Sequence, residues 1–579
     1  MGTISDKLMR VINTKEDIRK ALISKGYDVP TSIPFKEYAK MISDLPCKVD
    51  DFPKLPGDVT RWHFGGLTNE MMAAMDDPRI EDADHKGRFL SFKNFAWKGM
   101  SGVGGYAGDF SKWRNNRDTT EIGITESNLK VIIDVKVSQG AGKNIVFISK
   151  SNLGISNNVT IKITSTYPEG VMKFSNSASN KYLKLPSNGI ITLQDNPEYT
   201  SNEMYLHLAS ADLGQITIEQ LPLYPGALVF DGVDDYGTCD NFPILTKEKG
   251  YTVVALRQWI TYNPNAISAI ATNASDQSFN GAFTFENYNK GAEQTISYGA
   301  TQISLQYSKS PFSWQTTSKY NGVNIANGNK DATNSLVLGR SYPQRNDFAN
   351  FAIWELVFLD HDATEEELTK IKDYFVKTYP WLFFDQAWTV TGKTNEDEDR
   401  ATIANITGNG NDLVLSNFGF IEGSGYNEEG EYAGYLVTDG VDDSGRAVGL
   451  TISKDFTLVG EWILFSKTSV NAGLSIHPQI HIFNRPEVIQ IIFRTAGKTL
   501  PVKSLKAICS DGRCYDENWS ELKINVGEFT DNKGTLFVAS NGTNYAQIAF
   551  KNLGIYDNQI LSKDDCIKAY NYLQTLKSK

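Results

Sequence analysis

The chain contains two copies of one sequence pattern, and this duplication constrains its fold more than any other feature. Five short blocks occur twice, in the same order, along the 579 residues. The matched blocks begin at Trp62 and Trp388, Asn94 and Asn417, Leu228 and Leu436, Tyr251 and Phe456, and Trp354 and Lys551. Because chance rarely repeats five blocks in order, we interpret 60–382 as copy A and 386–579 as copy B of one domain.

The two copies differ in length because copy A carries extra residues between its second and third blocks. In copy B, Tyr426 nearly abuts Leu436, whereas in copy A a long segment separates Tyr106 from Leu228. This segment has its own alternating strand patterns, as in the run from Val159, so we predict a small inserted β-sandwich at 107–223. Domain A is then discontinuous, formed by 60–106 and 224–382, because a surface loop tolerates a long insertion.

Residues 1–50 have a helical rather than a β pattern. Apolar residues recur at steps of four and three over 3–25, and a second short helix is expected after Pro34, which predicts a helical hairpin. One interpretation is a cap that packs on its own chain. The other is a module for oligomerisation or virion docking, through the apolar stripe of Ile4, Leu8, Val11, Ile18 and Leu22. The breaker-rich segment 51–59 is expected to be a linker.

Charge and composition exclude several classes of protein. The chain has 57 Lys and Arg against 68 Asp and Glu, a net charge of −11, so a broad nucleic-acid surface is not expected. No apolar leader and no long apolar run occurs, so we expect neither a signal peptide nor a membrane partner. Five scattered cysteines do not make a disulfide framework. The abundance of glycine and aromatic residues favours a β-rich fold with many turns.

The repeated D-G-V-D-D motif is the clearest candidate for a metal site. Its carboxylates could supply oxygen ligands for Ca²⁺, or they could close a tight turn by hydrogen bonds to the backbone, and the turn is the preferred interpretation. The candidate ligands are Asp231, Asp234, Asp235, Asp439, Asp442 and Asp443. We find no paired carboxylates, nucleophile motif or nucleotide-binding loop, so no catalytic residue, no other cofactor and no enzymatic activity is expected. Residues that bind carbohydrate cannot be assigned.

The third to fifth blocks resemble the laminin-G-like, concanavalin A-like jelly roll. LVFDGVDDY from Leu228 and YTVVALRQW from Tyr251 carry the resemblance, together with the strand, Asp and acidic helix that follow Trp354. It implies two jelly-roll sandwiches, the first carrying the inserted domain. The opening segment DKLMRVINTKEDIRKALISKGYDVP resembles the start of fibre proteins in bacteriophages of gut Bacteroidales, including the crAss-like phages.

This resemblance implies a structural fibre protein of the head or tail of a virion. The β-domains would adhere to host surface polysaccharide, and the N-terminal helices would contact other virion proteins. The chain would be a homodimer or homotrimer, made in the host cytoplasm without a signal peptide and localised to the virion. Two alternatives remain at this stage: a phage polysaccharide depolymerase and a cellular lectin-like protein.

Overall fold

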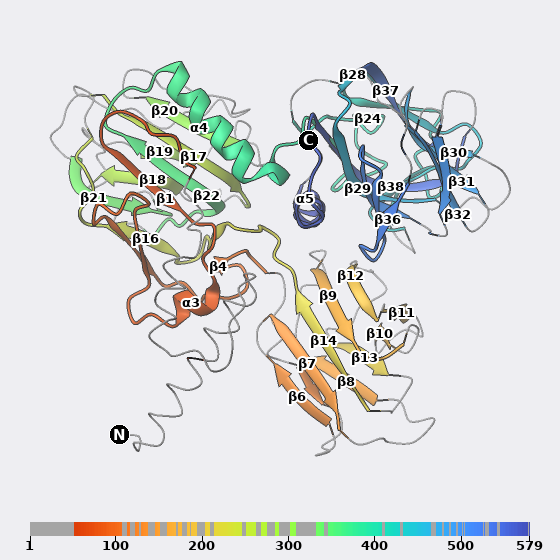
Figure 1. Cartoon of the computed structure of the whole chain (residues 1–579), viewed down its shortest axis with the longest axis horizontal. Helices are drawn as coiled ribbons and strands as arrows, with labels where there is room; N and C mark the ends of the chain where they lie inside the picture. The colour runs from red at the N-terminus through yellow and green to blue at the C-terminus, as the bar shows by residue number, and fades with distance from the viewer. Residues whose placement is uncertain are drawn as a thin grey trace.

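The structure is a computed structural model that describes residues 51–578 with gaps and, of residues 1–50, Lys15 alone. The larger gaps are 137–144, 151–158, 194–202, 275–283, 289–301 and 308–331. The expected helical hairpin, with Ile4, Leu8, Val11, Ile18 and Leu22, lies outside the described residues. The described part is built mainly from antiparallel β-sheets, which confirms the mainly β expectation (Figure 1).

Copy A forms two six-stranded sheets. The first contains, in order, β20 (Gln302–Tyr307), β17 (Thr252–Trp259), β22 (Asn350–Leu359), β15 (Leu228–Asp231) and β4 (Gly102–Val103), with β1 (Val59–His63) also paired to β22. The second contains β19 (Thr284–Tyr288), β18 (Ser268–Ala274), β21 (Ala332–Leu338), β16 (Tyr236–Cys239), β3 (Phe89–Lys93) and β2 (Arg79–Glu81). Apolar side chains from both sheets, such as Trp62 and Phe351 from the first and Leu90 and Leu338 from the second, share one buried core.

Copy B repeats this arrangement with two eight-stranded sheets. The first contains β26 (Gly425–Asn427), β27 (Tyr435–Val437), β38 (Ile548–Asp557), β29 (Phe456–Leu464), β34 (Leu505–Cys509), β35 (Arg513–Asp516) and β36 (Glu521–Lys523), with β23 (Gln386–Thr389) paired to β38. The second contains β24 (Thr402–Ile403), β25 (Leu413–Ser416), β28 (Ser444–Ile452), β37 (Asn532–Val538), β30 (Asn471–His477), β31 (Ile480–Arg485), β32 (Val488–Phe493) and β33 (Ala496–Leu500). Trp388, Phe550 and Leu536 lie in the core between the two sheets.

The strands between Tyr106 and Leu221 pair only with one another in the described part of the chain. One five-stranded sheet contains β11 (Tyr182–Lys184), β10 (Met172–Asn176), β13 (Glu203–Leu208), β8 (Ile145–Lys150) and β5 (Trp113–Asn115). The other contains β12 (Asn188–Leu193), β9 (Val159–Ser165), β14 (Gly214–Gln220), β7 (Lys130–Val135) and β6 (Ile122–Glu126). Strand β9 confirms the strand predicted from the alternation of Val159, Ile161 and Ile163 with polar residues. Ile161 and Ile163 are buried.

Three α-helices lie among the described residues: α3 (Asn69–Ala73), α4 (Glu365–Thr378) and α5 (Lys563–Thr575). The sequence predicts the caps of the last two correctly. Thr364 forms a capping box with Glu367 at the start of α4, and Ser562 accepts a hydrogen bond from the Asp565 N–H group at the start of α5. None of the helices in this part of the chain is long and apolar enough to cross a membrane.

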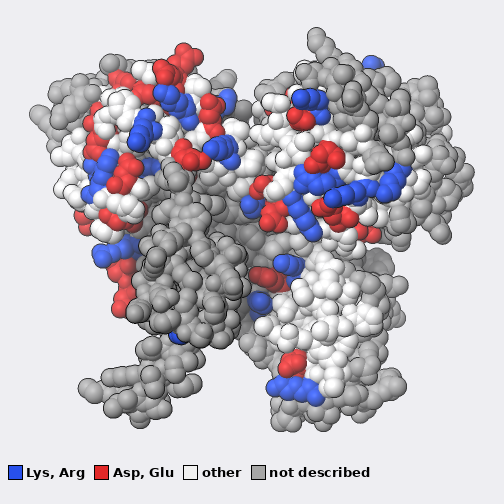
Figure 2. All heavy atoms as spheres, viewed as in Figure 1, with Lys and Arg blue, Asp and Glu red and all other residues white. Residues whose placement is uncertain are grey.

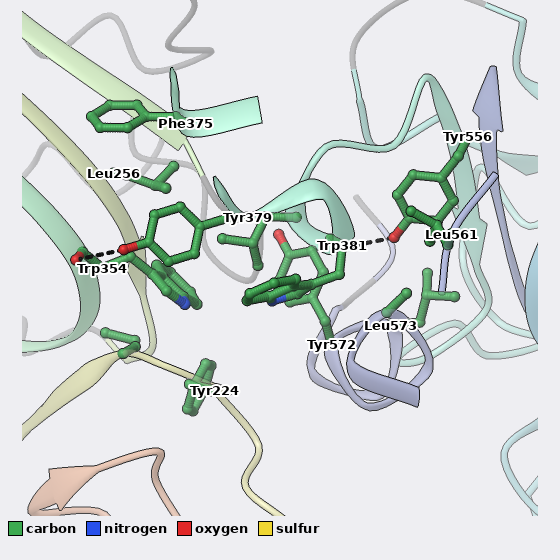
Figure 3. Close-up of a cluster of buried hydrophobic side chains, with 14 of the residues drawn as sticks. Tyr224, Leu256, Trp354, Phe375, Tyr379, Trp381, Tyr556, Leu561, Tyr572 and Leu573 are labelled. Carbon is green, nitrogen blue, oxygen red and sulfur yellow. Dashed lines mark hydrogen bonds between the residues drawn. The ribbon is translucent and has the colours of Figure 1, made fainter. Parts of the chain in front are cut away.

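Copies A and B are joined by a buried cluster rich in aromatic residues, part of which Figure 3 shows in close-up. The cluster begins with α4 and the short 3₁₀ helix η3 (Pro380–Leu382), which connect the two copies. Trp381 of η3 lies beside α5, and its carbonyl accepts a 2.7 Å hydrogen bond from the hydroxyl of Tyr556 in copy B. On the other side, the hydroxyl of Tyr379 donates a 3.3 Å hydrogen bond to the Trp354 carbonyl in copy A. The two copies therefore share one apolar cluster at their junction, in addition to the separate core inside each copy.

The segment expected to be a linker packs on copy A. The ring of Phe52 meets Tyr374 edge-on at 5.1 Å, and the Arg61 guanidinium lies 4.4 Å from the centre of the Phe52 ring. Asp51 pairs with Lys377 at 2.6 Å, and Asp58 pairs with Lys86 at 2.9 Å. These contacts hold residues 51–58 against α4 and β1.

The two ends of the extra segment in copy A lie side by side. The Leu223 N–H group donates to the Gly105 carbonyl at 2.9 Å, and the Tyr224 N–H group donates to the Gly104 carbonyl at 2.8 Å. We expect that replacing 107–221 by the sequence of Asn427–Glu431 leaves copy A folded, because this short connection already spans the same gap in copy B.

Differential scanning calorimetry of this deletion variant is the test, with the full chain as the control. A cooperative transition for the shortened protein supports independence of the inserted segment. A shortened protein that melts without a cooperative transition would show that copy A needs the segment to fold.

Candidate functional site

The D-G-V-D-D motif of copy A forms a tight turn after β15. The Oδ1 atom of Asp231 accepts a 2.8 Å hydrogen bond from the Val233 N–H group, and the Asp235 Oδ2 atom accepts a 3.0 Å bond from the Asp231 N–H group. Gly232 has a φ of 75°, and a Cβ atom there would lie 2.7 Å from Asn350, so the turn requires glycine. Most of the turn's carboxylate hydrogen bonds therefore close the backbone.

Copy B repeats these contacts almost atom for atom. Asp439 accepts from the Val441 N–H group at 2.8 Å, and Asp443 accepts from the Asp439 N–H group at 2.9 Å. Gly440 again has a left-handed φ of 77°. The preferred interpretation of the motif, a hydrogen-bonded turn, thus agrees with the contacts in both copies.

The turn also binds the second repeated block, which lies far away in sequence. In copy A the Ser101 hydroxyl donates a 2.9 Å hydrogen bond to Asp235, and the Asn94 side chain donates to the Asp234 carbonyl at 3.0 Å. In copy B, Ser424 donates to Asp443 at 3.1 Å. Asn94 adopts a left-handed φ of 68°, a conformation that asparagine tolerates better than most residues, and its counterpart Asn417 has a φ of 67°.

The first repeated block reaches the same network through its Thr-Asn-Glu sequence. The Asn69 side chain accepts from the Val103 N–H group at 2.8 Å and donates to the Val103 carbonyl at 3.0 Å. Asn395 makes the same pair of bonds to Tyr426 in copy B, each at 2.8 Å. Three of the five repeated blocks therefore converge on one polar network, and this convergence gives a structural reason for their repetition.

The acidic groups that the sequence selects as calcium candidates do lie together. In each copy the three carboxylates have oxygen atoms within 4.8 Å of one another. The sets are Asp231, Asp234 and Asp235 in copy A, and Asp439, Asp442 and Asp443 in copy B. Ca²⁺ takes six to eight oxygen ligands, whereas much of the acceptor capacity here is already used by N–H and O–H groups of the protein. Calcium binding remains a prediction from the sequence.

Burial changes the protonation behaviour of the network. Asp235 has no exposed surface, and this burial raises its pKa to about 7, although the hydrogen bonds from Asp231 and Ser101 oppose the rise. Burial also raises the pKa of Asp443 in copy B. Burial therefore favours the protonated form of these two carboxyl groups, while the hydrogen bonds of the turn favour the ionised form.

Copy A contains a second polar cluster that sequence analysis does not find. The buried Glu355 carboxylate on β22 contacts the Arg61 guanidinium at 3.3 Å and His63 Nδ1 at 2.5 Å. The hydroxyls of Tyr379 and Tyr374 donate to the same carboxylate at 2.9 and 3.3 Å. Arg61 and Glu355 are almost fully buried, whereas the side chain of His63 is 35% exposed. The signal available in the sequence is the presence of charged residues within strands that are otherwise apolar.

The matched positions of copy B have no charge. The pairing of His63 with Glu355 between β1 and β22 corresponds to the pairing of Thr389 with Asn552 between β23 and β38. When Trp62 is aligned with Trp388, the residue of copy B that corresponds to Arg61 is Ala387. The fold therefore does not require this cluster, which distinguishes copy A from copy B.

Copy B carries a different buried ion pair on the same face of its sheet. The Glu461 carboxylate on β29 accepts a 2.6 Å hydrogen bond from the Tyr435 hydroxyl and lies 3.8 Å from the ammonium of Lys551. Burial lowers the pKa of the neighbouring Lys506 to about 8, although Glu461 opposes this change. The two copies thus differ in the polar groups placed beneath their helices.

Comparisons with known proteins do not assign a family. No protein-family description and no curated protein matches the chain. Among solved structures, Trypanosoma rangeli sialidase has 9% sequence identity and a TM-score of 0.24, covering 88% of this chain and 98% of that one. The same enzyme with sialic acid has 9% identity and a TM-score of 0.23, covering 89% and 98%. A mutant displaying trans-sialidase activity has a TM-score of 0.22 at 9% identity, covering 85% and 92%.

This result corrects one expectation from the sequence. The absence of catalytic motifs led us to expect that the chain is not an enzyme, but the solved structures named above are all sialidases. We therefore withdraw that expectation. With TM-scores of 0.22–0.24, the likeness identifies neither the fold nor a reaction, and no catalytic role is transferred to residues of this chain.

The raised pKa of Asp235 predicts a pH dependence of stability. In the unfolded chain this carboxyl group should titrate near its ordinary value of 3.8, whereas in the folded chain its pKa is about 7. The folded state therefore binds more protons between these values, and it should lose stability as pH rises from about 4 to about 7. Asp235→Asn should remove this loss.

Urea unfolding of the wild type and of Asp235→Asn at pH 4, 5.5, 7 and 8 measures the difference. The stability of the wild type relative to the variant should fall up to about pH 7 and then stay level. Asp373→Asn on α4 is the matched control, because its side chain is exposed and it is not among the groups that act on the pKa of Asp235. A pH profile for Asp235→Asn that is parallel to the wild type would contradict the assignment.

The Glu355 cluster predicts a large cost for removing one charge. Glu355→Gln leaves the Arg61 guanidinium buried without its carboxylate, so we expect a loss of about 3–5 kcal/mol in the free energy of unfolding. Glu366→Gln on the exposed surface of α4 removes a charge that pairs with Lys370, and should change stability by less than about 1 kcal/mol. Equal effects of the two substitutions, measured by urea unfolding, would show that the buried pair is not important for stability.

Proposed function

We propose that this chain is a structural fibre protein of a bacteriophage virion, which displays two laminin-G-like β-sandwiches toward the host surface. The proposal starts from the resemblance of the opening segment to such fibre proteins, and from the resemblance of the D-G-V-D-D blocks to the laminin-G-like jelly roll. In this view the chain acts at the surface of the particle, on the head or the tail. Its ligand would be a host surface polysaccharide.

The observation that carries the proposal is the fixed tandem arrangement of two copies of one domain. Trp381 and Tyr379 connect the copies through a buried cluster rather than through an exposed tether. Two sites on such a unit would keep a constant separation, and a repeated polysaccharide could then be bound at two points at once. Simultaneous binding raises the overall affinity without any new contact, which suits adhesion by individually weak sites.

Features of the sheets support the laminin-G-like assignment. In each copy, one long central strand pairs with two shorter strands along one edge: β22 with β15 and β1, and β38 with β27 and β23. A helix that follows this strand, α4 or α5, packs on the outer face of the same sheet. The turn between β15 and β16, or between β27 and β28, carries the repeated motif at the end of the sandwich.

The surface is compatible with a polysaccharide ligand. Figure 2 shows acidic and basic side chains interspersed over copies A and B on the face in view. The described part of the inserted segment carries few charges on that face, around β9, β12 and β14. An uncharged sugar chain needs hydrogen bonds and apolar contacts rather than a surface of one sign. Val233 and Val441, at the tips of the matched turns, are 70% and 72% exposed and present the same apolar group in both copies.

The N-terminal stripe would attach the chain to the particle. Burying Ile4, Leu8 and Leu22 against a second copy, or against another virion protein, would contribute about 1.5–3 kcal/mol per side chain. The segment that follows it in the sequence, 51–58, packs on copy A through Asp51 and Phe52, so the β-domains would follow the attachment segment without a free linker. A homodimer or homotrimer would then place several pairs of β-domains around one attachment point.

Mass spectrometry of purified virions tests the proposal directly, since a fibre protein must be present in the particle. Deletion of 1–50, or Leu8→Asp together with Leu22→Asp, should reduce the oligomer to monomers and abolish incorporation into virions, because two buried charges cost more than the interface supplies. Light scattering reports the oligomer, and circular dichroism should show unchanged β-domains.

The double substitution Lys7→Asp and Lys20→Asp is the matched control, because both positions lie outside the predicted apolar stripe. It should leave assembly intact. Absence of the chain from virions would overturn the proposed function. Incorporation of the truncated chain would overturn only the role of residues 1–50.

A further inference from the structure

An arginine and an aromatic ring face each other beside the D-G-V-D-D turn of copy A. Tyr236 begins β16 directly after the turn, and Arg340 follows β21 after a single glycine. The central carbon of the Arg340 guanidinium lies 3.7 Å from the centre of the Tyr236 ring. Arg340 also forms a backbone bridge to Phe348, whose ring centre lies 6.3 Å from that of Tyr236. One guanidinium and two aromatic rings, all three side chains partly buried, therefore form one cluster.

Arg340 has no carboxylate partner within ion-pair distance among the described residues, whereas Arg61 in the same copy pairs with Glu355. The Arg340 Nε atom is buried without a hydrogen-bond partner. Burial lowers the pKa of this guanidinium, although Tyr236 opposes the change. Taking a cation out of water is costly, and the face of the Tyr236 ring offsets only part of that cost. The charge of Arg340 is thus available to an anion from outside the chain.

The shared fold does not require this cluster, because copy B lacks it. The turn and the backbone bridge occur in both copies, and an aromatic residue lies at one end of each bridge. The matched positions are Ser444 for Tyr236, Ser540 for Arg340 and Tyr545 for Phe348. Copy A therefore has a tyrosine and an arginine where copy B has two serines, which indicates a role in binding rather than in folding.

The charges around the cluster favour a ligand with a single negative group. Lys93 lies opposite Tyr236 in the pairing of β3 with β16, but its ammonium already pairs with Asp77 at 2.9 Å. Asp231 and Asp235 of the adjoining turn accept hydrogen bonds from backbone N–H groups. One guanidinium remains for a ligand. It matches a carboxylate better than a phosphate dianion or a nucleic acid, which would need several cations.

The combination of a guanidinium with aromatic rings fits an acidic sugar. The planar guanidinium presents N–H donors as a fork that can bind both oxygen atoms of a carboxylate. The rings of Tyr236 and Phe348 supply apolar surface for the C–H groups of a sugar, and the tyrosine hydroxyl adds a polar group. In a hexuronic acid the carboxylate is attached directly to the sugar ring, so one sugar residue makes both kinds of contact.

We propose that Arg340, Tyr236 and Phe348 form a binding site for a carboxylate-bearing sugar, such as a hexuronic acid residue of an acidic polysaccharide. The inference rests on the proposed function for the polymer that carries this sugar, and it specifies the chemical class of that polymer. Arg340 would bind the carboxylate, and the two rings would contact the sugar beside it. Copy B, with serine at two of the three positions, would not bind a carboxylate in this way.

Titration calorimetry of the full chain with two uronate polymers, polygalacturonate and hyaluronate, tests the site. Fully methyl-esterified polygalacturonate is the matched ligand, because it has the same sugar backbone without the charge. We expect the ester to bind about tenfold more weakly than the acid, since the charge-assisted contact is lost. Arg340→Ser, which introduces the residue of copy B, should weaken binding of the acid by a similar factor. Arg340→Lys should weaken it less, because lysine keeps the charge but not the fork.

Arg79→Ser is the matched control variant. Arg79 also lies over an aromatic ring, that of Phe89 at 4.8 Å, but it already has Asp77 as an acidic partner. This variant removes the same charge from copy A and should bind the acid as the wild type does. Scanning calorimetry should give both serine variants the melting temperature of the wild type, which separates a loss of binding from a loss of folding.

Four results would overturn the proposal. They are equal binding of the acid and its methyl ester, equal losses in Arg340→Ser and Arg79→Ser, absence of binding to both uronate polymers, and binding of poly-glutamate as tight as that of polygalacturonate. The last result would assign the site to an acidic peptide. None of them changes whether the chain is present in purified virions, so failure of this site is distinct from failure of the proposed function.

Discussion

The architecture depends on two strands that are buried on both faces, β22 in copy A and β38 in copy B. Nine of the ten residues of each strand are buried. Side chains of β22 such as Phe351 point into the core between the sheets, whereas Trp354 points toward the outer face. A strand in this position must be covered by a second sheet on one face and by a helix on the other. The placement of α4 and α5 follows from this requirement.

The same strands explain why distant segments meet. Because β15 and β1 pair with successive parts of one edge of β22, the first and third repeated blocks are brought together at one end of the sandwich. The second block then closes on them through Ser101 and Asp235. Tight turns joined by buried side-chain hydrogen bonds are expensive to leave incomplete, since each unsatisfied group costs about 1–3 kcal/mol. This cost gives a physical reason why the first, second and third blocks are repeated together.

The outer faces of the two sheets show how one fold can acquire different properties. Copy A places the Arg61 and Glu355 pair beneath α4, whereas copy B places Glu461 and Lys551 on the matching sheet. The fold is the same with either set of groups. The conserved part of each copy is the turn network, and the variable part is the packing beneath the helix.

The sequence by itself determined the mainly β character, the duplication, the caps Thr364 and Ser562, and strand β9 of the inserted segment. Each of these depends on local periodicity or on contacts between near neighbours, which a single pattern records. Only the tertiary structure decided that Asn69 bonds to the Val103 backbone, that Ser101 bonds to Asp235, and that Glu355 pairs with Arg61. The partners in these contacts are far apart in the sequence: Asn69 and Val103 by 34 positions, Ser101 and Asp235 by 134, and Arg61 and Glu355 by 294. They arise from sheet pairing and helix docking, so no local pattern in the chain contains them.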